Sequence, residues 1–265
     1  MLGAIVGDIV GSVYEFRNHR SKDFELFKPQ CFATDDSIMT LAIAKAVLES
    51  APDHHDLAEN AVKYMREIGQ PYPDCGYGGR FLDWMYSDHP KPYNSFGNGA
   101  AMRVSPVAYA AKSIEEVVEM SRAVTAVTHN HPEGIKGAEA TAVCTWLALQ
   151  GTGKDRILEV VNSLYYHIDF TLDEIRPTYR FNETCQDTVP QALEAFFEST
   201  DFEDAIRNAI SVGGDSDTLA AITGAVAGAY YGVPDEINRY ARFYLDSRLS
   251  DILAEFERKY LKRPS

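Results

Sequence analysis

The chain has 265 residues, of which 45% are hydrophobic, and these values are typical of a globular protein with a sizeable core and exclude wholesale disorder. A formal net charge of −14 argues against non-specific binding to nucleic acids or to anionic membranes. Any small anionic ligand would therefore need a local source of positive potential. The four cysteines form no CxxC pair, and the apolar N-terminal stretch lacks a basic leader. We expect a cytoplasmic protein with free thiols, no signal peptide and no membrane span.

Apolar residues recur every three or four positions through most of the chain, which is the period of an α-helix. Glycines and prolines mark several expected helix ends, as at Gly69 and Pro132. In chain order, helices are predicted at residues 3–16, 39–48, 57–68, 113–127, 132–149, 157–166, 192–198, 202–210, 219–231 and 252–260. Strand signals are weak, and the least regular stretches are residues 17–32, 87–98 and 170–185. Since no linker or repeat divides the chain, we expect an all-α fold, with one compact domain of many packed helices over residues 1–265.

The first predicted helix combines small residues with a polar stripe. Gly7 and Gly11 are one turn apart, which favours the close approach of another helix. Asp8, Ser12 and Glu15 stand at positions i, i+4 and i+7, so they would share one face of an otherwise apolar helix. Such a stripe either faces water or lines a buried site, and the helix alone does not decide between the two.

Two distant stretches carry more carboxylates than a helix start needs. FATDDS (residues 32–37) precedes one apolar helix, and GGDSDT (residues 213–218) precedes another. Asp, Ser and Thr are favoured at helix N-caps, and we expect Asp36 or Ser37 to act partly as a cap. If the two helix starts met, their carboxylates would repel one another unless protons or cations relieved the repulsion, and the hard oxygen ligands would suit Mg²⁺, Mn²⁺ or Ca²⁺ rather than zinc. The candidate set is Thr34, Asp35, Asp36, Asp215, Asp217 and Thr218.

Two glycine-rich turns are candidate anion sites. SFGNGAAMR (residues 95–103) stands before a predicted helix, where backbone N–H groups can approach an anion. GYGGR (residues 76–80) is a second glycine-rich turn before a helix, but a Gly-Asn-Gly turn is more often only a turn, and each stretch alone is weak evidence for an anion site. His129 and His131 precede the proline-started helix, where they could bind a metal, donate to a phosphate or pack against a ring. No GxSxG elbow or cysteine signature indicates a serine or cysteine hydrolase.

In combination, these stretches resemble the ADP-ribosylglycohydrolase family. Four motifs carry the resemblance in order: GDIVGSVYE (7–15), TDDS (34–37), GNGAAMR (97–103) and GGDSDT (213–218). The pair Thr128-His129 followed by Pro132 also fits. The first motif is closest in style to the branch with a catalytic glutamate acting on serine-linked ADP-ribose and on its polymer. The resemblance covers most of the chain and implies an all-α fold with a binuclear magnesium centre, with manganese in some members.

The resemblance also implies roles for individual residues. The implied metal ligands are Thr34, Asp35, Asp36, Asp215, Asp217 and Thr218. Glu15 matches the catalytic glutamate, and Asp36 is expected to contribute to catalysis as well. The diphosphate is expected over the 97–99 turn and the following helix N-terminus, which would supply the missing positive potential. The residues that match the diphosphate and ribose segments are Phe96, Gly97, Asn98, Gly99, Ala100, Met102 and His129.

The implied function is a magnesium-dependent hydrolase that cleaves the bond at the anomeric carbon of ADP-ribosyl groups. Its substrate would be a modified protein or an ADP-ribose-containing small molecule. One alternative is a non-catalytic ADP-ribose-binding or crystallin-like structural member of the fold, and another is a different two-metal hydrolase. The leaving group stays open among serine, arginine, an ADP-ribose polymer, an acetyl ester and a nucleic-acid end. Residues 170–190 match no family motif and are expected to shape the adenosine or leaving-group side.

Overall fold

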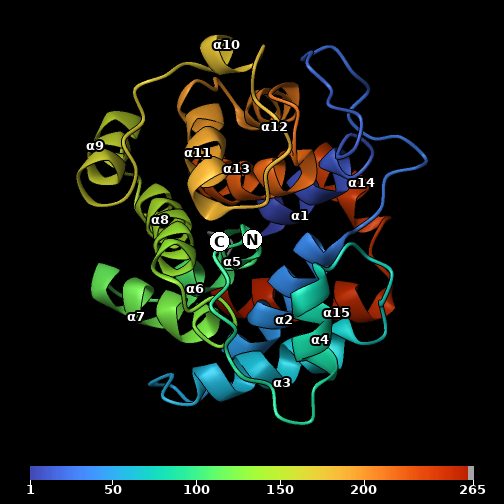
Figure 1. Cartoon of the computed structure of the whole chain (residues 1–265), viewed down its shortest axis with the longest axis vertical. Helices are drawn as coiled ribbons and strands as arrows, with labels where there is room; N and C mark the ends of the chain where they lie inside the picture. Colours follow the sequence, from blue (N-terminus) through green and yellow to red (C-terminus); the bar gives the residue numbers. More distant parts are fainter. Residues whose placement is uncertain (262–265) are drawn as a thin grey trace.

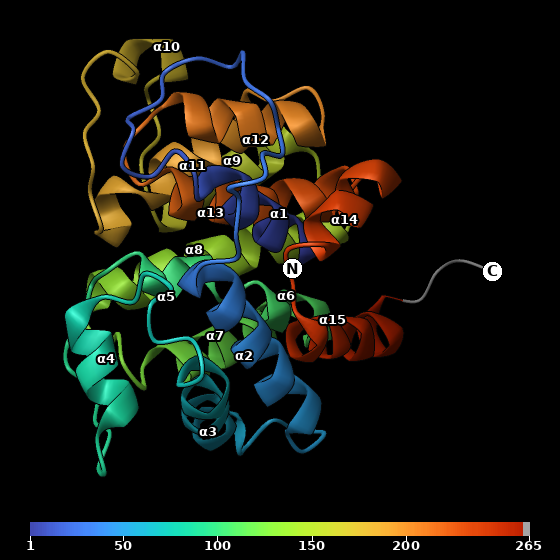
Figure 2. The same ribbon diagram turned by 90° about the vertical axis from the view of Figure 1, so that its right-hand side faces the viewer.

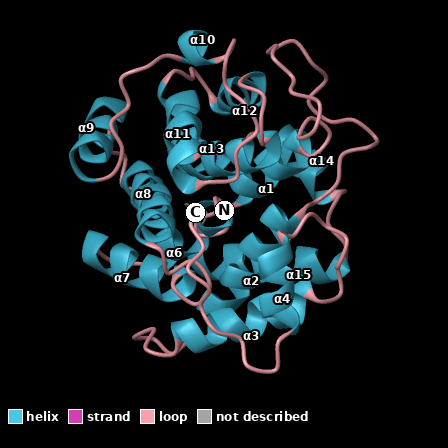
Figure 3. Cartoon of the chain, in the orientation of Figure 1, coloured by secondary structure: helices cyan, strands magenta, loops and turns pink. Residues whose placement is uncertain are grey.

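A computed structural model describes residues 1–261, and helices make up nearly all of its regular structure (Figures 1 and 3). They are α1 (Leu2–Gly11), α2 (Asp35–Glu49), α3 (Leu57–Gly69), α4 (Gly79–Tyr86), α5 (Gly99–Met102), α6 (Pro106–Ala110), α7 (Ile114–Thr125), α8 (Pro132–Leu149), α9 (Lys154–Leu164), α10 (Leu172–Ile175), the 3-10 helix η1 (Cys185–Asp187), α11 (Val189–Phe197), α12 (Phe202–Ser211), α13 (Ser216–Tyr230), α14 (Asp235–Arg242) and α15 (Ser247–Tyr260). Residues 1–261 contain no strand, and one isolated β-bridge joins Gly97 to Thr184. Buried side chains from these helices form one continuous core, which confirms the predicted all-α fold of one compact domain.

α1 and α13 pack against each other in the middle of the molecule (Figures 1 and 2). α1 is buried all along its length from its second residue onward. A Cβ atom on Gly7 would lie 1.9 Å from the carbonyl oxygen of Ala220, and a Cβ atom on Gly11 would lie 2.4 Å from Cα of Asp217. Only glycine permits this approach, so the helix contact predicted from the glycine spacing is confirmed. The contact sets the start of α13 against the end of α1.

The remaining helices form two halves around this pair. Figure 2 shows α11, α12, α13 and α14 in the upper half with α1, and α2, α3, α4 and α15 in the lower half. α2 contacts α1 and α3, whereas α8 contacts α5, α7 and α13. The first turns of α2 and α13 therefore come from different halves, and they meet beside α1.

Several predicted helix limits were wrong. α1 ends at Gly11 rather than at residue 16, because the backbone changes there to i→i+3 turns such as the 2.7 Å bond from Tyr14 N–H to Gly11 O. Glu15 therefore lies in a turn and not on a helical stripe with Asp8. The helix after the 97–99 turn, α5, has only four residues. The helices α6, α10 and α14 were not predicted, because segments of eight residues or fewer show too few turns for a clear period.

No helix within residues 1–261 is long and apolar enough to cross a membrane. All four cysteines are free thiols, as expected. Cys31, Cys144 and Cys185 are buried, and Cys75 is partly exposed. The cytoplasmic location stays a prediction.

Candidate active site

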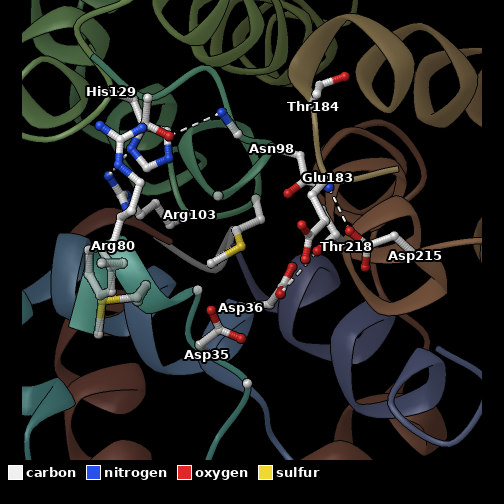
Figure 4. A pocket seen from close by; sticks show the side chains of 18 of the residues that line it. Asp35, Asp36, Arg80, Asn98, Arg103, His129, Glu183, Thr184, Asp215 and Thr218 are labelled. Carbon is white, nitrogen blue, oxygen red and sulfur yellow. Dashed lines mark hydrogen bonds between the residues drawn. The ribbon is translucent and has the colours of Figure 1, made fainter. Parts of the chain in front are cut away.

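A cavity of about 410 Å³ lies where the starts of α2, α5 and α13 meet, and its size is in the range of small-molecule sites. Figure 4 shows acidic residues from α2 and α13 on one side of it, and Arg103 and His129 on the other. Twelve of the predicted site residues line the cavity: Glu15, Asp35, Asp36, Phe96, Gly97, Asn98, Gly99, Met102, His129, Asp215, Asp217 and Thr218. The other two, Thr34 and Ala100, are buried outside this lining.

Asp8 organises the start of α2, although its sequence position indicated only membership of a polar stripe. It is fully buried, and its Oδ2 accepts the backbone N–H groups of Thr34 and Ser37, each at 3.0 Å. Its Oδ1 accepts the Thr34 hydroxyl at 2.6 Å. Thr34 is the N-cap of α2 and accepts the Asp36 N–H at 3.2 Å. The expectation that Asp36 or Ser37 caps this helix is therefore wrong, because Thr34 occupies the cap position.

The start of α13 reaches the same point from a distant part of the chain. The Thr218 hydroxyl donates to Oδ2 of Asp36 at 3.2 Å, across 182 positions of sequence. Oδ2 of Asp215 accepts the side-chain amide of Asn98 at 2.6 Å. The other oxygen of Asp36, Oδ1, is buried without a hydrogen-bond partner. A buried, unpartnered carboxylate oxygen is costly, so this atom is suited to a ligand that supplies positive charge.

Carboxylates crowd this end of the cavity. Oxygens of Asp8, Asp36 and Asp217 lie within 4.8 Å of one another, and so do oxygens of Glu15, Asp215 and Asp217. Burial, followed by the charge of Asp217, raises the pKa of Asp36 well above its usual value. Burial also raises the pKa of Asp215 to about 6. Both shifts show that this site disfavours negative charge unless protons or cations are bound.

This donor set fits a hard divalent cation. Both clusters consist of carboxylates alone, and oxygen ligands favour Mg²⁺, Mn²⁺ or Ca²⁺ over zinc. Asp8 already accepts three hydrogen bonds, so Asp36 and Asp217 are better suited to coordinate an ion than Asp8 is. Asp35 is partly exposed in the cavity wall, and burial of its carboxyl, with the charge of Asp217, raises its pKa well above the usual value.

Glu15 is half-buried in the turn that follows α1. Asn18 in this turn and Arg20 just after it connect the turn to other parts of the site. Oδ1 of Asn18 accepts the N–H of Gly214 at 3.3 Å, which joins the turn to the loop before α13. Arg20 donates to the carbonyl oxygen of Tyr179, which joins the turn to the 170–190 segment. Glu15 is thus held at the edge of the cavity by contacts that no local sequence pattern indicates.

The 97–99 turn is also joined to the 170–190 segment. The N–H of Asn98 donates to the carbonyl of Glu183 at 2.7 Å, and the N–H of Gly97 donates to Oγ of Ser95 at 3.2 Å. The side chain of Asn98 donates to Thr188 as well as to Asp215, so it holds the Asp215 carboxylate in place. With these groups already bonded and α5 so short, the turn offers fewer free N–H groups and a smaller helix dipole than the sequence indicated.

Sequence reasoning missed several residues that line the cavity. They are Arg80, Tyr93, Arg103, Phe181, Glu183 and Thr184. Arg80 and Arg103 end the motifs GYGGR and GNGAAMR, and a basic residue beside a glycine-rich turn of an acidic chain was the signal available for them. Phe181, Glu183 and Thr184 had no motif signal and come from the 170–190 segment, which does shape one side of the cavity.

The two histidines have different positions. Nδ1 of His131 accepts the N–H of Glu133 at 3.1 Å, so His131 is the N-cap of α8. His129 is buried and lines the cavity. Neither belongs to the two carboxylate clusters.

Comparisons with known proteins agree with the family resemblance of the sequence and with the all-α fold. The model of a family described as ADP-ribosylglycohydrolase matches residues 1–260. The chain is 27% identical to ADP-ribosylhydrolase ARH3 of Bos taurus, over 96% of this chain and 90% of that protein. It is also 27% identical to ADP-ribosylarginine hydrolase Tri1 of Pseudomonas putida (strain GB-1), over 88% of this chain and 70% of that protein. A solved ADP-ribosylglycohydrolase-related protein complex shares the fold, with a TM-score of 0.66 and 24% identity over 97% of this chain and 96% of that one. These matches confirm the resemblance inferred from the four motifs.

Proposed function

The chain belongs to the ADP-ribosylglycohydrolase family of hydrolases acting on glycosyl bonds, and on this basis we propose that it releases ADP-ribose from a modified protein or another ADP-ribosylated acceptor. The bond hydrolysed is the one at the anomeric carbon. The observation that carries the proposal is the meeting of the starts of α2 and α13 beside Glu15 in one cavity. Burying so many carboxylates together is costly, and a purely structural protein would have no use for it.

Two Mg²⁺ ions, replaceable by Mn²⁺, are the proposed cofactors. The proposed ligands are Thr34, Asp35, Asp36, Asp215, Asp217 and Thr218. The unpartnered oxygen of Asp36, the raised pKa values of the acidic residues and the all-oxygen donor set support this assignment. The Thr34 hydroxyl has two lone pairs, of which the Asp36 N–H uses one, so one is left for a cation. When bound, such ions lower the pKa of water and stabilise negative charge that develops during hydrolysis.

Glu15 is the proposed proton acceptor. Its carboxyl lies at the edge of the cavity with an oxygen within 4.8 Å of those of Asp215 and Asp217. From there it would accept a proton from the attacking water or assist the leaving group, a role worth about 10²- to 10⁴-fold in rate. Positive charge in the site keeps a carboxyl ionised, which suits a base better than an acid. Asp36 would contribute to catalysis through its unpartnered oxygen, Oδ1.

The opposite wall of the cavity would hold the ADP-ribosyl group. The diphosphate is proposed to lie near the 97–99 turn, with the neighbouring lining residues and His129 around the ribose. Arg80 and Arg103 line the same wall and add the positive potential that an acidic chain needs to bind an anion.

The proposal is tested with two alanine variants. Asp36→Ala and Asp217→Ala should lose metal binding and, with it, ADP-ribose release by at least about 10²-fold. Asp251→Ala, which removes an exposed carboxylate on α15, is the matched control and should behave like the wild type. Release is measured with Mg²⁺ and with a chelator. Full activity of either variant in the chelator would contradict the two-metal mechanism. Binding of ADP-ribose without any metal-dependent release would favour the non-catalytic alternative.

Identifying the leaving group requires a panel of substrates. The two relatives described above have the same 27% identity to this chain, and only one of them has an amino acid in its name, so the identity does not choose among linkages. ADP-ribose linked to serine, to arginine, to a second ADP-ribose, to an acetyl group or to a nucleic-acid end should be compared with and without Mg²⁺. We expect metal-dependent release from at least one of them, with the strongest preference for the serine linkage or the polymer on the style of the first motif.

A further inference from the structure

His129 is surrounded by hydrogen-bond donors on one side of its ring. The hydroxyl of Thr128 lies 2.7 Å from Nδ1, and the guanidinium Nη2 of Arg103 lies 3.3 Å from the same atom. Nη2 of Arg103 also donates to the Thr128 hydroxyl at 2.6 Å. These three side chains are buried, with exposed fractions of 0%, 2% and 5% for Thr128, Arg103 and His129. The three polar groups therefore form a closed triangle at the base of the cavity.

The triangle distinguishes the two neutral forms of the imidazole. A guanidinium can only donate, so a proton on Nδ1 would face an N–H of Arg103 directly. With Nδ1 unprotonated, that nitrogen accepts from Arg103 and from the Thr128 hydroxyl at once. The alternative acceptor for the hydroxyl, the carbonyl of Thr125, is farther away at 3.4 Å. All three contacts are satisfied when Nδ1 is unprotonated, whereas a proton on Nδ1 could still reach the Thr128 hydroxyl but would oppose the N–H of Arg103.

We infer that Arg103 and Thr128 are positioning residues that hold His129 as the neutral tautomer with its proton on Nε2, so that His129 presents a permanent N–H donor to the cavity. Nε2 faces the 97–99 turn, since a Cβ atom on Gly97 would lie 3.5 Å from it and one on Gly99 would lie 3.6 Å from it. The matching ligand group is an oxygen acceptor, which is either a phosphate oxygen or a ribose hydroxyl. This inference deepens the proposed function and rests on it for the identity of the ligand.

The charge of Arg103 also favours a neutral His129 ring with its proton on Nε2. Its hydrogen bonds go to Thr128 and His129, and no carboxylate within residues 1–261 forms a salt bridge with it. The charged and titratable groups that face His129 are Arg103, Arg80 and Tyr93, whose ring lies 6.0 Å from that of His129. None of them is negative at neutral pH. Burial, followed by the charges of the two arginines, lowers the pKa of His129 well below its usual value, so the ring stays neutral.

Nuclear magnetic resonance of the protein labelled with ¹⁵N-histidine tests the inference without ligand or turnover. Two-bond ¹⁵N–¹H correlations distinguish a proton on Nε2 from one on Nδ1, and His129→Gln identifies the signal among the seven histidines. We expect the Nε2–H pattern throughout the range from about pH 5 to pH 8. A wild-type spectrum showing the Nδ1–H form, or a doubly protonated ring at pH 6 to 7, would overturn the inference.

Variants separate positioning from simple packing. Arg103→Lys keeps a donor and should keep the Nε2–H pattern, whereas Arg103→Met should allow the Nδ1–H form, with its proton directed to Thr128. Thr128→Val, nearly equal in shape, should keep the tautomer because Arg103 remains, and it serves as the second test if Arg103→Met does not fold. Calorimetric titration with ADP-ribose should show about a tenfold loss of affinity for Arg103→Met, the value of one hydrogen bond. An unchanged Nε2–H spectrum in Arg103→Met would remove Arg103 from this role. Because the spectra need no hydrolysis, they decide the tautomer even if the proposed function fails.

Discussion

The pKa of Glu15 is set by its neighbours in the folded chain. Burial is the largest cause, followed by the negative charges of Asp217 and Asp8, and together they raise this pKa to about 8. In the protein alone, Glu15 therefore holds a proton near neutral pH. Cations at the adjacent carboxylates would lower the pKa again, because they remove the repulsion that raised it. Glu15 would thus be an ionised base only when the site is loaded.

Replacing Glu15 by glutamine tests this role at the scale of one residue. Glu15→Gln keeps the shape of the side chain and removes its ability to accept a proton. Turnover with Mg²⁺ should fall by about 10²- to 10⁴-fold, while ADP-ribose affinity by calorimetry stays near the wild-type value. Thermal stability in a chelator should change little near neutral pH, since the glutamine replaces a carboxyl that is already protonated there.

Glu183→Gln is the matched control for this variant. Glu183 is an exposed carboxylate that lines the same cavity, and its replacement should leave most of the turnover. Wild-type turnover in Glu15→Gln would exclude Glu15 as the base. Equal losses in the two variants would instead indicate a general electrostatic effect of the acidic side.

At the residue scale, side-chain types were predictable and their partners were not. The stretch TDDS could be recognised as a surplus of hard ligands from composition alone, because a helix cap needs only one of them. Asp8 could not be separated from a solvent-facing stripe. Its hydrogen bonds come from Thr34 and Ser37, which are 26 and 29 positions away in the sequence. Only the folded backbone shows that Asp8 holds the start of α2 in place.

At the scale of helices, the contact between α1 and α13 positions one side of the site. Gly11 lies against the first turn of α13, and a Cβ atom there would be 2.4 Å from Cα of Asp217. Gly11→Ala should push this turn away and displace the Asp217 carboxylate. We expect a loss of about 1–3 kcal/mol in unfolding free energy, together with a weaker affinity for Mg²⁺. Urea unfolding and calorimetric titration with Mg²⁺ measure the two effects.

Two glycines provide controls for that variant. A Cβ atom on Gly3 would lie 2.0 Å from the carbonyl of Gly224, at the far end of the same helix contact. Gly3→Ala should therefore lose stability but keep the Mg²⁺ affinity of its folded fraction. Gly153→Ala, where nothing lies within 4 Å, should change neither quantity. If Gly3→Ala weakens Mg²⁺ binding as much as Gly11→Ala does, the effect is global and the local explanation is wrong.

Sequence periodicity predicted the long helices well and their ends poorly. α8 and α13 contain many turns, so their apolar pattern is clear, and Pro132 marks the start of α8. The end of α1 depends on tertiary contacts instead. Ser12 donates to Ile9 O, and its oxygen accepts the N–H of Phe32, which lies 20 positions later. The place of the 170–190 segment could not be predicted either. It lies in the cavity wall because of backbone hydrogen bonds to the 97–99 turn and its neighbours, and its own sequence shows no periodic pattern that indicates this.

At the scale of the whole molecule, folding brings acidic side chains from three distant segments into one buried cluster. The pKa of Glu15 is raised to about 8, and the pKa values of Asp35, Asp36 and Asp217 are raised well above their usual value. A carboxyl with a raised folded-state pKa binds its proton more tightly in the folded than in the unfolded chain. Its contribution to stability is therefore full at low pH and is lost as the pH rises toward the folded-state pKa. Cations that replace those protons should compensate for this loss.

Mg²⁺ and protons would compete for the same carboxylates, so the last prediction concerns the stabilisation by Mg²⁺ as a function of pH. Other shifted groups, such as Glu194 with a pKa of about 7, contribute equally with and without Mg²⁺ and cancel in the difference. The rise in Tm on adding Mg²⁺ to chelator-treated protein should therefore grow between pH 6.5 and about 8, where Glu15 loses its proton. At a hundredfold excess over Kd, one site should add about 2.7 kcal/mol, or roughly 5–10 °C in a chain of this size. Asp217→Asn should abolish most of the rise. A rise of the same size at both pH values would show that Mg²⁺ does not compete with protons at this cluster.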